Sequence, residues 1–150
     1  MTKFTNPENL RKPPSLSPTL TKDAARLWRL FNAGQAHEIT AAYGLGQMVA
    51  TALSQSGGRR STVIAELAAH AGIPPAMLND FHKLVRVFDP EFIKQCGTRT
   101  TRSGRKISLQ HLLLLAAIDG LPLRNVMVEE FYVADLTVEM LEARIGLDVI

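Results

Sequence analysis

Positively charged side chains are the residues of this sequence best placed to do chemistry, and they form two groups. Arg59 and Arg60 follow a pair of glycines. The second group lies in the carboxylate-free segment 98–106, among threonine, serine and glycine: Arg99, Arg102, Arg105 and Lys106. Cations, hydroxyls and a glycine on a polar loop can approach phosphate oxygens. The second group therefore predicts either a phosphate contact or a solvated loop.

Nucleophiles and metal ligands form no recognisable constellation. Cys96 has no histidine or asparagine partner that spacing identifies, although the cationic loop beside it could lower the pKa of its thiol. The histidines lack both His-Glu-x-x-His and paired-cysteine spacing: His37, His70, His82 and His111. Gly44-Leu45-Gly46 lacks the strand and the later glycine of a phosphate loop. We therefore expect no enzyme activity, no metal and no cofactor.

The strongest pattern covers twenty residues from Ile64 to Lys83. A helix-turn-helix needs a small residue where its helices cross, a turn residue that accepts positive φ, and apolar residues at buried positions. Ala68 falls at the crossing and Gly72 at the turn. The buried positions are all apolar: Leu67, Ala71, Ile73, Leu78 and Phe81. The pattern predicts this motif over 61–88, although any two packed helices joined by a glycine turn would also satisfy it.

In a DNA-reading motif the second helix would be the recognition helix, here Pro75 to Arg86. Asparagine can pair with adenine in the major groove, and lysine can contact guanine or phosphate. Asp80 fits less well, because its carboxylate repels phosphates, although it could accept from cytosine N4. The exposed face predicted for this helix carries Ala76, Asn79, Asp80 and Lys83, and with them His82 and Arg86.

A wider resemblance follows from these residues and from two later motifs. Gly58-Arg59-Arg60, Leu67-Ala68, Gly72-Ile73 and Met77-Leu78 resemble helical domains at the N-terminus of bacterial proteins linked to restriction and mobile elements. The later Ser-x-x-His and Leu-Ser-Val-Arg-Glu-Leu-like helices of those domains are similar to 108–111 and 136–141 here. The helical part of the centromere-binding ParB and KorB proteins is comparable. The resemblance covers 35–145 and implies DNA binding; nuclease and nucleotide-hydrolysing segments are lacking, so it implies neither activity.

Helices are the elements that must position these residues. Apolar residues recur at helical spacing, and alternation typical of strands is absent except beside 98–101. We predict Thr21, Ser108 and Thr137 as N-caps, and Gly120 and Gly146 as helix stops. The predicted helices begin at Thr21 and then cover 35–55, 61–70, 75–88, a short turn near Phe92, 109–118, 123–133 and 138–145. The prediction is an all-α helical bundle that contains the helix-turn-helix.

Length and composition limit the class of protein. A chain of 150 residues makes about one domain. Residues 1–20 contain four prolines and the cations Lys3, Arg11 and Lys12, which predicts a disordered basic arm, either solvated or in contact with DNA. Residues 21–150 are predicted to form a single helical domain. One cysteine favours a reducing cytoplasm, and the longest apolar run, 112–118, is too short for a membrane helix.

Charge is distributed unevenly along the chain, although the net charge is only +3. Residues 1–60 carry eight Lys/Arg against three Asp/Glu, and residues 61–106 carry seven against four. Residues 107–150 reverse the balance, with two Lys/Arg against seven Asp/Glu. We expect Glu129 and Glu130 to form a solvated helix face or an acidic surface for a basic partner.

These observations favour a small bacterial protein that binds double-stranded DNA. We expect a transcriptional regulator or an accessory factor of a plasmid, phage or similar element, acting in the cytoplasm as a homodimer. The alternative is a protein-interaction adaptor that keeps a helix-turn-helix core but does not read DNA. Asp80 and the two prolines at the start of the second helix support the alternative.

Overall fold

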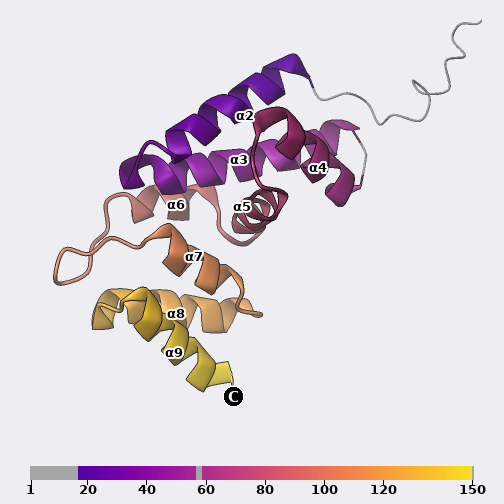
Figure 1. Ribbon diagram of the computed structural model, residues 1–150. Helices are drawn as coiled ribbons and strands as arrows, with labels where there is room; N and C mark the ends of the chain where they lie inside the picture. The colour runs from indigo at the N-terminus through magenta and orange to yellow at the C-terminus, as the bar shows by residue number, and fades with distance from the viewer. Residues whose placement is uncertain (1–16, 57–58, 150) are drawn as a thin grey trace, which may run out of the picture.

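The computed structural model describes residues 17–56 and 59–149, and every regular element within them is a helix (Figure 1). The helices are α2 (Pro18–Phe31), α3 (Gln35–Ser56), α4 (Arg60–Ala71), α5 (Pro75–Val87), α6 (Pro90–Cys96), α7 (Leu109–Ala116), α8 (Leu121–Ala134) and α9 (Val138–Val149). The described residues contain no strand, and 98–101 belongs to an irregular loop. The predicted all-α class is therefore confirmed.

Helix α3 is the centre of the N-terminal half, because α2 and α5 both pack extensively along it. Gly46 makes the contact with α5 possible. A Cβ atom at this position would lie 2.2 Å from the carbonyl oxygen of Phe81, so the two helices meet backbone to backbone. Leu45 and Val49, which flank the glycine on α3, are fully buried. A Cβ atom at Gly44 would lie 3.1 Å from the Leu27 side chain of α2, so the two glycines let α3 pack closely against both of its neighbours.

The first described helix begins earlier than the sequence predicted. Ser17 is the N-cap of α2, and its Oγ accepts from the N–H of Leu20 at 3.0 Å. Pro18 occupies the first turn, where its missing N–H costs no hydrogen bond. Thr21 lies inside the helix and is not its cap. Residues 18–20 are thus helical and do not belong to an arm, whereas Lys3, Arg11 and Lys12 lie outside the described residues.

Helix α7 connects the two halves, since it contacts α5 on one side and both α8 and α9 on the other. Leu112 and Leu115, from the longest apolar run of the sequence, are fully buried in it. No helix of the described residues is long and apolar enough to cross a membrane.

The caps predicted for the C-terminal half are correct, and both predicted helix stops are wrong. Ser108 caps α7, and the Thr137 side chain accepts from the N–H of Met140 at the start of α9. Gly120 does not stop α7, which ends at Ala116 with Ala117 as its C-cap; with a φ of 98° it is instead the N-cap of α8. Gly146 does not stop α9, which continues to Val149. A glycine that keeps a negative φ is compatible with a helix interior, so its presence alone does not end one.

Candidate nucleic-acid interface

Helices α4 and α5 are joined by a tight turn at Gly72. This glycine has a φ of 74°, the left-handed conformation that a helix C-terminus often requires. Its N–H and that of Ile73 both donate to the carbonyl oxygen of Ala68, at 2.8 and 3.0 Å. Ala68, Leu67, Ile73, Leu78 and Phe81 are buried as predicted, and Ala71 is half-buried. The turn therefore has the local geometry that the sequence pattern predicted.

The outer surface of α5 carries four residues that we call the α5 stripe: Ala76, Asn79, Lys83 and Arg86. Successive helical residues rotate by about 100°, so these four lie within a sector about 80° wide. Lys83 is half-buried and the other three are exposed. Asp80 is also exposed, at the edge of the stripe. The opposite side of α5 is buried, which fixes the stripe as its solvent face.

The start of α4 adds two cations near the end of α5. Arg59 is the N-cap of α4 and Arg60 its first residue, and both are exposed. Burial lowers the pKa of His82, and the positive charges of Arg86 and Arg60 lower it further. Two cations that are distant in the sequence therefore lie around one histidine. Within 17–56 and 59–149, no salt bridge engages these two arginines, Arg59 or Lys83.

His82 itself does not belong to the exposed face, so that part of the sequence prediction is wrong. Its side chain is only 6% exposed. Among the described residues, its Nδ1 is the buried side-chain polar atom that lacks a hydrogen-bond partner. The reason is its position on the helix, where 78, 81 and 82 are buried and the α5 stripe faces away from them.

The loop 98–106 is a different kind of basic segment, because its arginines pair with carboxylates of the same chain. Arg99 donates two hydrogen bonds to Glu129 of α8, at 3.1 and 3.0 Å, and lies 3.8 Å from the centre of the Tyr132 ring. These contacts raise the pKa of Arg99 and lower that of Glu129. Glu130 pairs with Arg144 of α9 in the same way. The two glutamates thus neutralise cations of this chain rather than form a bare acidic face.

Asp135 fixes the other end of the loop. It follows α8 with a φ of 56°, a left-handed conformation that aspartate tolerates better than most residues. Its Oδ1 accepts from Thr101 Oγ1 at 2.5 Å and from Arg105 Nε at 3.1 Å. Hydrogen bonds from Ser103 and Thr101, with the charge of Arg105, lower the pKa of Asp135 to about 2. The loop is therefore attached to the C-terminus of α8.

The two basic segments do not meet. In Figure 1 the loop 98–106 projects at one end of the molecule, beside the C-terminal end of α8, and α4 lies at the opposite end. Arg102 and Lys106 are exposed, and neither forms a salt bridge within the described residues. The predicted site residues therefore form two separate groups: Arg59, Arg60, Ala76, Asn79, Asp80, Lys83 and Arg86 on α4 and α5, and Arg99, Arg102, Arg105 and Lys106 on the loop.

Sequence reasoning missed the residues that hold the loop, above all Thr101 and Asp135. Thr101 is 5% exposed although it lies in a polar segment that the sequence presents as solvated. The one available signal was Asp135 itself, a residue tolerant of positive φ directly after a predicted helix. Its partners lie about thirty residues earlier in the chain, and no spacing rule connects them.

The two motifs behind the family resemblance are in direct contact. His111 Nδ1 accepts from the N–H of Ser108 at 3.1 Å and lies 2.7 Å from its Oγ, which completes a capping box on α7. Because Nδ1 accepts, Nε2 carries the proton and donates to the carbonyl oxygen of Leu136 at 3.0 Å. The ring also packs edge-on against Phe131. Ser108 and His111 thus position the segment that leads into α9.

The described residues contain no candidate metal site, and their one cysteine is not activated. Cys96 is buried, and burial raises the pKa of its thiol to about 11 despite the nearby charge of Arg99. The thiol therefore stays protonated at neutral pH, contrary to the effect expected from the cationic loop. No group of histidine, cysteine and acidic side chains there could hold a metal ion.

Comparisons of the chain with protein families, with characterised proteins and with solved structures give no match.

Proposed function

We propose that the chain is a DNA-binding protein of the helix-turn-helix class, acting in the bacterial cytoplasm as a transcriptional regulator or as an accessory factor of a plasmid or phage. The observation that carries the proposal is the α5 stripe, a polar and cationic helix face directly after a tight turn. Its cations have no carboxylate partner among the described residues. The likeness to ParB- and KorB-type helical domains supports the same class.

In this proposal α5 enters the major groove with the α5 stripe facing the bases. Asn79 is the residue suited to adenine, and Lys83 or Arg86 can reach guanine or a phosphate. Arg59 and Arg60 contact the phosphate backbone, which sets orientation without reading sequence. Asp80 at the edge of the stripe disfavours close phosphates and leaves cytosine N4 as its one good partner. The proposed contact is therefore mainly electrostatic, with few specific base contacts.

Few base contacts per chain favour a homodimer, because two copies read two half-sites. Four large apolar side chains in the described residues are exposed, and all of them lie on α8 and α9: Leu121, Val126, Val133 and Met140. We place the dimer contact on these helices. This position leaves the α5 stripe of each copy free for DNA.

Fluorescence anisotropy with a short random duplex tests the proposal. Each cation that contacts a phosphate adds about 0.9 to the magnitude of the slope of log affinity against log salt. Four such cations are proposed, Arg59, Arg60, Lys83 and Arg86, so the slope should be roughly −4 per chain. Lys83→Gln with Arg86→Gln should reduce the magnitude of that slope by about 2. The matched control replaces two exposed arginines of α2, Arg26 and Arg29, and should leave it unchanged. Absence of binding at about 50 mM salt would falsify the proposal.

A second candidate function is a protein-interaction adaptor whose α4–α5 unit serves only as a packed core. The exposed apolar residues of α8 and α9 favour it, because exposed clusters of this type mark interaction sites. The same titration separates the candidates. An adaptor would bind duplex weakly, and the α5 and α2 variants would then behave alike.

A further inference from the structure

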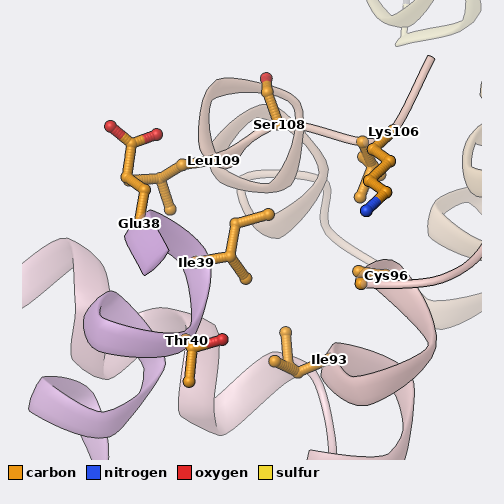
Figure 2. Close-up of a pocket in the computed structure, with 10 residues that line it drawn as sticks. Glu38, Ile39, Thr40, Ile93, Cys96, Lys106, Ser108 and Leu109 are labelled. Atoms are coloured by element: carbon orange, nitrogen blue, oxygen red, sulfur yellow. The ribbon is translucent and has the colours of Figure 1, made fainter. Parts of the chain in front are cut away.

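A pocket of about 420 Å³ lies between the two halves of the molecule, away from the α5 stripe (Figure 2). Its walls come from the start of α3, the end of α6 and the segment 106–109 that leads into α7. The volume is within the range of about 300–1,000 Å³ that is typical of small-molecule sites.

The pocket combines an apolar interior with one cation. Ile39, Ile93 and Leu109 line it, and the last two are buried. Figure 2 shows the ammonium nitrogen of Lys106 directed toward Cys96 and the interior, whereas the carboxylate of Glu38 is directed outward. Lys106 forms no salt bridge within the described residues. The pocket therefore offers apolar contact together with one positive charge at its border, that of the exposed Lys106, which has no salt-bridge partner among the described residues.

Of the other polar groups of the lining, Glu38 directs its carboxylate away from the interior, and Thr40 adds an uncharged, exposed hydroxyl. The Ser108 hydroxyl lies 2.7 Å from Nδ1 of His111 and caps α7, so it is not free for a ligand. The Cys96 thiol is buried and protonated, which makes covalent capture unfavourable. Recognition in this pocket therefore rests on Lys106 and the apolar walls.

We propose that this pocket binds a small monocarboxylate with an apolar body, either medium-chain aliphatic or aromatic. The carboxylate pairs with Lys106, and the apolar body lies against Ile39, Ile93 and Leu109. A bound molecule touches α3, which packs on α5, and also the segment that enters α7. Such a ligand stabilises the folded chain by mass action, since its site is assembled only on folding.

The test uses octanoate as the probe on the full chain, with octanol and octylamine at the same concentrations. Binding is followed by calorimetry and by the methyl NMR signals of Ile39, Ile93 and Leu109. Octanoate should bind with a sub-millimolar Kd and shift these signals, whereas octylamine should not bind. Lys106→Gln should weaken octanoate binding roughly tenfold or more, because it removes a charge-assisted hydrogen bond.

Arg102→Gln is the matched control, since it removes an exposed cation of the same loop that does not line the pocket. It should change the Kd for octanoate by less than about twofold. The proposal is wrong if octanoate leaves the three methyl groups unshifted at millimolar concentration, or if octanol binds equally well and Lys106→Gln changes nothing. Because no DNA is present, the result is independent of the α5 stripe and of the function proposed for it.

Discussion

The α5 stripe and the loop 98–106 both present cations in the sequence, yet the chain uses them in different ways. Lys83 and Arg86 lie on a helix face with no carboxylate partner among the described residues. Arg99 and Arg105 pair with Glu129 and Asp135 of the acidic C-terminal half. A run of cations is therefore weak evidence for a nucleic-acid contact until the carboxylates of the whole fold are located.

The two regions are also held by different forces. Beneath the α5 stripe, α5 and α3 pack backbone to backbone at Gly46, and the interface is apolar. The loop is held by hydrogen bonds and ion pairs to α8, and its neighbour α7 by the capping box of Ser108 and His111. Changes in packing should therefore affect the first region most, and changes in charge or protonation the second.

The largest effect is expected from disruption of the packing under the α5 stripe. Gly46→Ala places a Cβ atom 2.2 Å from the carbonyl oxygen of Phe81, and a backbone atom cannot move away alone. We expect a loss of about 3 kcal/mol in the free energy of unfolding, or a fall in Tm of roughly 10 °C, measured by circular dichroism.

Gly44→Ala is the control, because its Cβ would meet only the flexible end of Leu27, at 3.1 Å. A helical alanine also gains up to about 1 kcal/mol over glycine, so its stability should stay within roughly 1 kcal/mol of the wild type. Equal losses for the two variants would show that α3 and α5 do not depend on this close contact.

The two buried histidines, His82 on α5 and His111 on α7, test the difference between the regions. His111→Leu removes the partners of the Ser108 N–H and the Leu136 carbonyl, which should cost about 2 kcal/mol. His82→Leu removes a buried Nδ1 that has no partner, so its cost should be below about 1 kcal/mol. Urea denaturation of both variants measures the contrast, and a larger loss for His82→Leu would contradict it.

The contributions of His82 and His111 to folding stability depend on pH in a defined direction. Burial is the main reason that both histidine pKa values are lowered below 6.5. The folded state thus disfavours the protonated forms, so this contribution to stability is complete above pH 6.5 and is lost as the pH falls below it. The wild type should lose stability on acidification from pH 7, and His111→Leu should lose less.

Neutralising two cations in either basic region should have an intermediate effect, measured as a change in DNA affinity. Lys83→Gln with Arg86→Gln should weaken binding to random duplex roughly tenfold at about 50 mM salt. Arg99→Gln with Arg105→Gln should change it less than about threefold, because Glu129 and Asp135 already neutralise these arginines. Anisotropy titrations compare the two variants directly. A larger loss from the loop variant would transfer the proposed interface to the loop.

The α4–α5 unit could be predicted from the sequence because its rules are local. Gly72 in the left-handed region, Pro75 in a first turn and apolar residues at helical spacing are each determined by near neighbours. Ser17 as the cap of α2 follows the same rules. The sequence prediction misses this cap because Pro18 also fits the proline-rich segment before it, although proline suits the first turn of a helix.

The environment of the loop could not be predicted in the same way. Arg99 and Glu129, or Thr101 and Asp135, are about thirty residues apart, and a single sequence does not specify which distant charges meet. The segment 98–106 contains no carboxylate, but the surface that it forms is not purely basic, because carboxylates from elsewhere in the chain pair with its arginines. Its counter-charges come from α8 and the residue that follows it, Asp135, and the uneven charge along the chain is a further trace of this pairing in the sequence.

The smallest and most local effect concerns Asp135. Its carboxylate accepts from Thr101 and Arg105, and the amide of Arg105 also donates to Thr101 Oγ1, at 3.1 Å. Asp135→Ala should therefore raise amide hydrogen exchange roughly tenfold at Thr101, Gly104 and Arg105. Asp135→Asn is the conservative control, because it keeps one acceptor oxygen and tolerates the positive φ, and its effect should be smaller.

The protection of the loop 98–106 against amide hydrogen exchange should fall as the pH is lowered. The pKa of Asp135 is about 2 in the folded chain, against an ordinary value of 3.8. The contribution of the carboxylate is complete above the ordinary value and is lost as the pH falls through the folded value. Protection of the loop should persist at pH 4 and disappear toward pH 2, and Asp135→Ala should lack this transition. Loss of protection near pH 6 instead would indicate that His111 and not Asp135 holds the loop against α8.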